Sequence, residues 1–497
     1  MNNKKIDILR GYKMKAASDE MLQYTNSIDH DYELFEYVIK VNTVHVLSLY
    51  KKGIIERNHA LKLIKSLKSI RKSSVNDYKL EDVHMNIENI IIKKTGKKIG
   101  GQLNLGKSRN DQVVTSIRLL TKNYIIDLLQ SLINLEKVLL QISKKNTSVV
   151  IPSYTHLQQA QFSTVSHYYL AHHDSIFRDI QRLLECYDRV NKSTMGAGAI
   201  STVLVEIDRK YVANLLGFDG LVENSIDSVS NRDFMFECIS LISILMTNVE
   251  KIANEIILWN SSEFSYLNVS DKYASTSSIM PQKKNPAVAE IIRAKTAKIL
   301  GNFVTSMTIV KNLTLGYHLD YQEITPKLSD SFVEAISTVD ILSNMLKEIT
   351  FNENTINNQL DNGMGAADLA NYLAEKNYVS FREAHHIVGM LSNLSIQNQI
   401  SLKEIVKTKL SVISKQISNK SIELSDEQIE NIMSPLSNVN LKKTIGGPSI
   451  SQSNTMISKR EKNIKTIDHL VKKMINKLDS TEHKLESEIC KLEEVKS

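Results

Sequence analysis

The chain has 497 residues, of which 42% are hydrophobic and 24% charged, with 17 glycines and only 6 prolines. This length exceeds one ordinary domain, and the composition is typical of a soluble globular protein. The net charge of +7 is spread along the chain, without the basic, aromatic-studded patch of a nucleic-acid-binding protein. Residues 1–11 lack the apolar segment of a secretory signal, and no apolar run could span a bilayer. We therefore expect a cytoplasmic protein that binds neither nucleic acid nor membrane.

Cysteine and histidine give little indication of metal binding. Cys186, Cys238 and Cys490 are scattered, which predicts neither a disulfide framework nor a zinc ribbon and favours a reducing compartment. His167 and the pair at 172–173 lack the i, i+4 spacing of a helical zinc site. We predict no metal ion and no other cofactor.

The sequence pattern predicts short helices in the N-terminal third of the chain and much longer helices in three later stretches. Residues 107–151, 221–280 and 327–362 contain neither glycine nor proline. Apolar residues recur there at three- and four-residue steps, the pattern of an amphipathic helix. The apolar positions are Ile117, Leu120, Tyr124, Leu128, Leu132, Leu135, Leu139 and Ile142 in the first stretch, Phe234, Cys238, Leu241, Leu245, Val249, Ile252 and Ile256 in the second, and Phe332, Ala335, Val339, Leu342 and Leu346 in the third.

Long helices with wide apolar faces need partners, which predicts a bundle that subunits could share. Alternation of period two is scarce, so we expect no sizeable sheet. We predict an all-α protein with an N-terminal helical domain (1–106), a central long-helix bundle (107–360) and a C-terminal helical domain (361–497). The tail repeats apolar residues from Ile464 to Leu492 at heptad-like spacing, which predicts a terminal helix added to the C-terminal domain, or a short coiled coil.

Four polar stretches interrupt this pattern, each at the end of a predicted long helix. They are residues 106–112 (GKSRNDQ), 152–161 (PSYTHLQQAQ), 275–286 (STSSIMPQKKNP) and 317–327 (YHLDYQEITPK). Loops at the ends of rigid helices are suitable places for catalytic groups. Taken singly, the first three also have ordinary explanations: a helix cap with a surface ion pair, a structural histidine, and a serine-rich turn with solvated lysines.

The chemistry of three stretches suits a reaction at a carboxylate. Residues 275–286 offer hydroxyls, backbone N–H groups, an ammonium and an amide, which suit a developing carboxylate-derived anion. His156 is the residue type that usually moves protons near neutral pH. Arg109 could clamp a carboxylate at the start of a helix that Ser108 or Asp111 caps.

Together the four stretches resemble the signatures of the fumarase/aspartase superfamily and, within it, of the argininosuccinate lyase family. The superfamily loop GSSxMPxKxN corresponds here to TSSIMPQKKN at 276–285. The sequences MPQKKNP, SRNDQ, YTHLQQAQ and GYHLDYQE are similar to those of the argininosuccinate lyase family. The resemblance runs from about residue 26 to residue 447. It implies a three-domain all-α fold whose long helices form a bundle shared in a homotetramer, with each active site built from three subunits.

The resemblance also implies the reaction, a reversible anti elimination of argininosuccinate to L-arginine and fumarate in the last step of arginine biosynthesis. It implies Ser277 as the catalytic serine and base, and His156, oriented by Glu290, as the other acid/base group. Lys283 and Asn285 would hold the carboxylate and stabilise the dianion. Which of Ser277 and His156 removes the proton stays open. The substrate-binding residues that it implies are Ser27, Asp31, His84, Ser108, Arg109, Asn110, Thr155, Asn285, Tyr317, Gln322 and Lys327.

Some positions depart from the family pattern. Thr276 and Ser153 stand where glycine is usual, Lys107 replaces an arginine, and Asn104-Leu105 replaces a His-Thr pair. None of these changes removes a proposed catalytic group. Two alternatives remain at this point: another lyase of the superfamily, acting on adenylosuccinate or aspartate, and a non-catalytic structural protein on the same scaffold.

Overall fold

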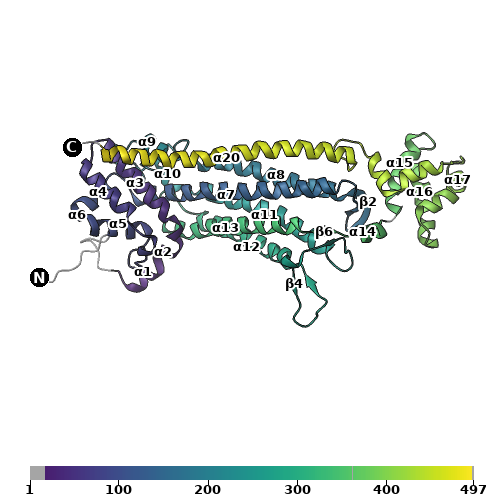
Figure 1. Cartoon of the computed structure of the whole chain (residues 1–497), viewed down its shortest axis with the longest axis horizontal. Helices are drawn as coiled ribbons and strands as arrows, with labels where there is room; N and C mark the ends of the chain where they lie inside the picture. Colours follow the sequence, from purple (N-terminus) through teal and green to yellow (C-terminus); the bar gives the residue numbers. More distant parts are fainter. Residues whose placement is uncertain (1–16, 361, 495–497) are drawn as a thin grey trace.

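The computed structural model describes residues 17–360 and 362–494. Residues 1–11, from which we predicted a cytoplasmic protein, lie outside this range. The protein is elongated, with five long helices side by side at its centre and shorter helices at either end (Figure 1). These five are α7 (Arg109–Lys145), α8 (Val165–Val190), α11 (Asp233–Trp259), α12 (Ala287–Val310) and α13 (Thr325–Lys347). Across the described residues, no helix combines the length and apolarity needed to cross a membrane.

The predicted long helices are confirmed by α7, α11 and α13. Helix α7 has 37 residues and begins with a capping box, in which Ser108 Oγ accepts from Asn110 N at 3.3 Å and Asp111 Oδ1 accepts from Ser108 N at 3.1 Å. It ends with Lys144 and Lys145, whose charges suit a helix C-terminus. The predicted apolar stripe, apart from the half-buried Tyr124, is buried against the neighbouring helices.

Shorter helices form the N-terminal end, and most of their buried apolar residues belong to the same core as the bundle. They are α1 (Asp19–Thr25), α2 (Ile28–Asp31), η1 (Tyr32–Leu34), α3 (Phe35–Lys51), α4 (Arg57–Lys68), η2 (Lys72–Ser74), α5 (Val83–Thr95), α6 (Lys97–Gly100) and η3 (Gly101–Asn104). The connections between bundle helices add α9 (Arg209–Leu215), α10 (Ser225–Ser230), η4 (Asp271–Tyr273) and η5 (Leu319–Glu323).

Strands form three two-stranded antiparallel sheets within the described residues. They are β1 (Val150–Thr155) with β2 (Gln158–Thr164), β3 (Leu267–Asn268) with β6 (Thr350–Phe351), and β4 (Ser275–Thr276) with β5 (Lys284–Asn285). The interpretation of residues 152–161 as a loop was wrong, because most of them belong to the first hairpin. Val150, Ile151 and Phe162 are buried there, and His156 and Leu157 both have a positive φ, as a two-residue type I′ turn requires.

The C-terminal end has a hydrophobic core of its own, separate from that of the bundle. Its elements are α14 (Glu353–Gln359), η6 (Asn362–Gly365), α15 (Ala366–Glu375), α16 (Phe381–Asn398), α17 (Leu402–Ser418), α18 (Asp426–Met433) and α19 (Pro435–Leu441).

The tail forms one helix, α20 (Ile450–Glu494), which runs back along the bundle to the N-terminal end (Figure 1). The heptad-like pattern therefore predicted a helix correctly. The helix does not add to the C-terminal domain, however, because its buried residues Ile457, Ile464, Val471, Leu485 and Leu492 join the core of the bundle. Ion pairs such as Arg460–Asp174 support this packing.

Candidate active site

A small cavity lies at the N-terminal end of the bundle and collects residues from distant parts of the chain. Ser27 and Asp31 come from the start and end of α2, and Tyr317 and Gln322 come from the segment around η5. The remaining lining residues are Asp82, Val113, Ile117, Arg232, Tyr321 and Thr325. Four of the predicted substrate-binding residues are thus brought together within one chain.

Asp31 is the most perturbed carboxyl of this cavity. Burial raises its pKa to about 7, although the Ser27 hydroxyl, which donates a hydrogen bond to Asp31 Oδ2, partly opposes the shift. The nearby Asp82 carboxylate adds to the rise. Asp31 can therefore exchange a proton near neutral pH, as groups at functional sites often do.

Arg109 is the first residue of α7, and two acidic side chains hold it in the structure. Its Nη1 lies 3.1 Å from Glu81 Oε2 and 3.2 Å from Asp82 Oδ2. Asp82 in turn caps α5 by accepting from Met85 N at 2.7 Å. Burial raises the pKa of the Asp82 carboxyl, and the charge of Arg109 acts against this rise. The guanidinium predicted to clamp substrate therefore also stabilises a buried carboxylate.

His84 is buried, and neither of its ring nitrogens has a hydrogen-bond partner among the described residues. Burial lowers its pKa well below the ordinary value, and the charges of Arg109 and Lys107 lower it further. The imidazole is therefore neutral at physiological pH, and both of its nitrogens are buried within the protein.

A network of buried hydrogen bonds holds the start of α7 and the segment that precedes it. Lys107 Nζ donates to Asn42 Oδ1 and, at 3.1 Å, to Gln112 Oε1. Burial lowers the pKa of this lysine to about 8. Asp111 Oδ2 accepts from Gly196 N at 3.0 Å and from Gly198 N at 2.9 Å.

Next to this network in the sequence, Asn110 Nδ2 donates a hydrogen bond to Ala199 O at 3.1 Å. These bonds fix the backbone that carries Ser108, Arg109 and Asn110.

The loop around Ser277 is exposed and is closed at its base by the pairing of β4 with β5. Ser277 Oγ accepts hydrogen bonds from Ile279 N at 3.3 Å and Met280 N at 3.1 Å. Lys283 Nζ donates to Asn285 Oδ1 at 2.6 Å. The loop therefore brings the predicted serine, lysine and asparagine onto one short hairpin with its own internal bonds.

The other predicted residues lie elsewhere in the chain. Thr155 and His156 are exposed at the tip of the β1–β2 hairpin, at the end of the bundle that adjoins the C-terminal helices (Figure 1). Glu290 is exposed in the first turn of α12 and makes no hydrogen bond to His156 in the described chain. Lys327 lies in the first turns of α13 but does not line the cavity.

One chain thus separates the predicted site into three places along its long axis: the cavity, the Ser277 loop and the hairpin.

Sequence reasoning missed Arg232 and Asp82, which line the cavity beside the predicted residues. Arg232 is buried over the Tyr321 ring, 4.6 Å from its centroid, and its Nη2 has no hydrogen-bond partner among the described residues. Burial lowers the pKa of this guanidinium to about 10. Its position directly before the long helix α11, like that of Arg109 at the start of α7, is a signal that could have identified it.

Comparison with known proteins identifies the family. A family model described as "Lyase" matches residues 12–301, and one described as "Argininosuccinate lyase C-terminal" matches residues 363–440. The argininosuccinate lyase of Methanocaldococcus jannaschii is 37% identical over 98% of this chain and 97% of its own. That of Methanosarcina barkeri is 37% identical over 92% of this chain and 93% of its own. The chain belongs to the argininosuccinate lyase family.

Solved structures share the fold of this argininosuccinate lyase family member. An EDDS lyase in complex with formate superposes with a TM-score of 0.86 at 22% identity, and the match covers 96% of each chain. A class II fumarase from Schistosoma mansoni gives a TM-score of 0.70 at 15% identity, over 84% of this chain and 94% of that one. At these identities the likeness establishes the fold alone.

Proposed function

We propose that this protein cleaves argininosuccinate to L-arginine and fumarate, and that it acts in the cytoplasm as an enzyme of arginine biosynthesis. The observation that carries the proposal is membership of the argininosuccinate lyase family over nearly the full chain, including the family-specific C-terminal part. The three cysteines, Cys186, Cys238 and Cys490, are few and scattered along the chain, which suits a reducing compartment.

In the proposed reaction a base removes a proton from the carbon next to a carboxylate, and the C–N bond to the arginine nitrogen then breaks. Ser277 is suited to the role of base, because two backbone N–H groups already point at its Oγ and would stabilise an alkoxide. Lys283 and Asn285, bonded to each other in the same hairpin, would stabilise the dianion that forms. His156, oriented by Glu290, would supply the other proton transfer.

The cavity at the N-terminal end is proposed to bind the substrate away from the reacting bond. Ser27, Asp31, Tyr317 and Gln322 offer it hydroxyl, carboxyl and amide groups. The neutral His84 and the cation Arg109 lie beside it, with Ser108 and Asn110 on the same segment. Lys327, Thr155 and Asn285 are proposed to complete the binding residues once subunits assemble.

A homotetramer with active sites built from three subunits is the proposed assembly. Two features of the chain support it: the cavity, the Ser277 loop and the His156 hairpin lie apart in one subunit (Figure 1), and the outer faces of two bundle helices expose apolar side chains. These are Ile291, Leu300, Val304 and Met307 on α12, and Val333 and Ile341 on α13. Exposed apolar surface of this kind indicates a protein interface.

The function is tested by measuring fumarate release from argininosuccinate, adenylosuccinate and aspartate with the purified protein. We expect release from argininosuccinate only, with a Ser277→Ala variant as the control for contaminating activity. Activity on only one of the other two substrates would replace the proposed substrate. A folded protein with no activity on any of them would favour the non-catalytic alternative.

The assembly is tested by complementation between two inactive variants. We expect that Ser277→Ala and His156→Ala proteins, unfolded together and refolded as mixed oligomers, recover part of the activity, because some sites then receive both intact residues from different subunits. Each variant refolded alone is the control. Mixed oligomers that form but remain inactive would mean that both residues of a site come from one subunit.

A further inference from the structure

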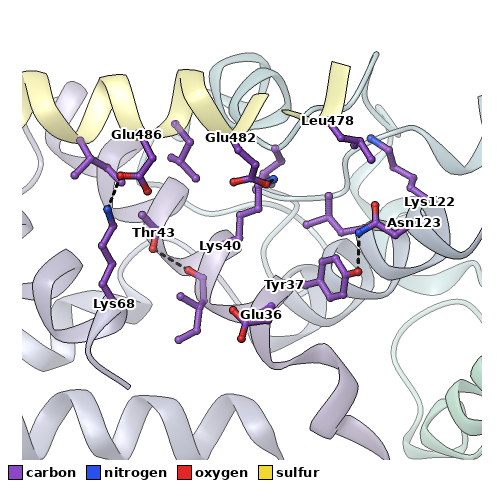
Figure 2. A pocket seen from close by; sticks show the side chains of 15 residues that line it. Glu36, Tyr37, Lys40, Thr43, Lys68, Lys122, Asn123, Leu478, Glu482 and Glu486 are labelled. Atoms are coloured by element: carbon purple, nitrogen blue, oxygen red, sulfur yellow. Dashed lines mark hydrogen bonds and ion pairs between the residues drawn. The ribbon is translucent and has the colours of Figure 1, made fainter. Parts of the chain in front are cut away.

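Two cavities of the chain differ in how their charged groups are satisfied. The larger, of about 450 Å³, lies between α3, α7 and the last turns of α20. Figure 2 shows an ion pair across it, in which Lys68 Nζ lies 2.6 Å from Glu486 Oε2, and the buried Lys122 Nζ donates to Gly217 O. The smaller is the cavity of the candidate active site. Its Arg232 forms no ion pair within the described part of the chain.

Arg232 is buried, with 3% of its surface exposed, and backbone carbonyls and an aromatic ring hold its guanidinium. Nη1 donates to Val229 O at 3.0 Å and to Asn231 O at 3.3 Å. Cζ lies 4.6 Å from the centroid of the Tyr321 ring. A buried cation without an anion lowers the free energy of unfolding unless other groups stabilise it. The carbonyls and the negative face of the ring stabilise this one, so Arg232 and Tyr321 depend on each other for their positions.

Tyr321 lies in η5, in the segment that carries the proposed substrate-binding residues Tyr317 and Gln322. Its ring centroid is 6.1 Å from that of Tyr317, in an edge-to-face arrangement, and its backbone N–H donates to His318 O at 3.2 Å. Tyr321 is itself buried. A contact that fixes this ring therefore also fixes Tyr317, which packs against it, and Gln322, which follows it in the chain.

The residue two positions before Arg232 holds the start of the same segment. The buried Ser230 Oγ accepts a hydrogen bond from Gly316 N at 2.7 Å. Gly316 has a φ of 120°, a conformation that is open to glycine but rarely to other residues. Residues 230–232 thus contact the segment at Gly316 and at Tyr321, on both sides of Tyr317.

We propose that Arg232 is a positioning residue for substrate binding, which together with Ser230 holds residues 316–322 so that Tyr317 and Gln322 keep their binding positions. The inference rests on the proposed function for the identity of the substrate, but not for the placement of the segment. Arg232 acts through Tyr321, because its Nη1 is bonded to backbone carbonyls and its Nη2 is buried.

Steady-state kinetics of the full chain test this role. In Arg232→Met we expect the KM for argininosuccinate to rise about tenfold, the equilibrium effect of one desolvated cation–π contact. The kcat should change by no more than about threefold, because a lost binding contact that is equal in ground and transition states raises KM alone. Arg232→Lys retains the charge and should recover part of the affinity. Ser230→Ala removes one hydrogen bond and should raise KM about threefold.

Arg118→Met is the matched control. Arg118 is also buried over an aromatic ring, 4.1 Å from the centroid of Phe234, and donates to Arg189 O at 3.1 Å and Val190 O at 3.2 Å. It lines a different cavity from Arg232. Its loss should lower the Tm as that of Arg232 does, yet leave KM unchanged. An equal rise of KM in both variants would reflect a general loss of structure and would overturn the proposal.

A double-mutant cycle separates positioning from direct contact with substrate. Tyr321→Leu alone should raise KM. Adding Arg232→Met should raise it little further, because both substitutions act through the same ring. Fully additive effects would mean that Arg232 contacts the substrate independently of Tyr321, which is contrary to the proposal.

Amide hydrogen exchange of residues 316–322 tests the placement without any need for activity. Exchange there should be faster in Arg232→Met than in the unchanged protein, and the same in Arg118→Met. Unchanged exchange in Arg232→Met, or faster exchange with an unchanged KM, would overturn the proposal. If Arg232→Met does not fold, Ser230→Ala and Arg232→Lys take its place in both measurements, with the same outcomes decisive.

The two measurements also separate this proposal from the proposed function. If the unchanged protein cleaves adenylosuccinate or aspartate and not argininosuccinate, the proposed substrate is wrong, and KM is compared for the substrate that it does cleave. If it cleaves none of them, the proposed function fails, and hydrogen exchange alone decides whether Arg232 holds the segment.

Discussion

The cavity at the N-terminal end and the Ser277 loop differ in how the chain holds them. Around the cavity, side chains are buried and paired, as Arg109 is with Asp82, and Asp31 has a pKa raised to about 7 by burial. In the loop, Ser277, Lys283 and Asn285 are held by local hydrogen bonds on an exposed hairpin. A substitution in the cavity should therefore change both stability and binding, whereas one in the loop should change turnover alone.

The largest effect is expected from Ser277→Ala. We expect turnover of argininosuccinate to fall by roughly 10²–10⁴-fold, the range for losing an acid/base group. The Tm and the oligomeric state should stay unchanged, because the loop contributes little to the core. Steady-state kinetics and thermal unfolding measure the two quantities, with Ser278→Ala as the matched control. Near-normal turnover in Ser277→Ala would remove this serine from the mechanism.

Arg109→Met is expected to change both the stability of the protein and its binding of substrate. It leaves the Asp82 carboxyl, whose side chain is only 8% exposed, without its cation, which should cost about 1–3 kcal/mol of stability. We also expect a higher KM, because a proposed contact with substrate is lost.

Arg109→Lys is the control for this variant. It retains the charge but not the planar fork, so it should recover more stability than affinity. An unchanged Tm in Arg109→Met would show that Asp82 does not need this partner.

Asp31→Asn tests the electrostatics of the cavity through pH. Because the folded protein holds the Asp31 proton up to a pKa of about 7, against 3.8 ordinarily, stability should fall as the pH rises from about 4 to about 7. Asparagine has no such proton, so the decline in Tm over this range should be smaller in the variant. Thermal unfolding at several pH values measures it, with the exposed Asp29→Asn as control. A decline equal to that of the unchanged protein would contradict the raised pKa.

Thr276→Gly should have the smallest effect. Thr276 is exposed and is the strand partner of Lys284 at the base of the loop. Glycine should lower the free energy of unfolding by about 0.5 kcal/mol, because it has greater freedom in the unfolded chain. Turnover should change by no more than about threefold, because one exposed residue of this kind shifts free energies by less than 1 kcal/mol. A large gain in turnover would instead mean that threonine restrains the motion of the loop.

Local sequence was sufficient for the parts of the protein that depend on local rules. The spacing of apolar residues predicted the long helices, since a helical stripe must be buried wherever it occurs. Ser108 and Asp111 identified the start of α7 through hydrogen bonds within one turn. The motifs around Ser277 and Arg109 identified the family, because the signature residues are close together in the chain.

The tertiary structure decided what depends on distant contacts. Residues 152–161 form a hairpin because Ile151 and Phe162 are buried, which their polar neighbours concealed. The heptad pattern of the tail predicted α20, but not that it would pack on the bundle, since an apolar stripe does not specify which surface covers it. Arg232 joined the cavity through the packing of α11, and Asp31 acquired its raised pKa through burial. These properties arise only when separate segments exclude water together, so no single segment of sequence contains them.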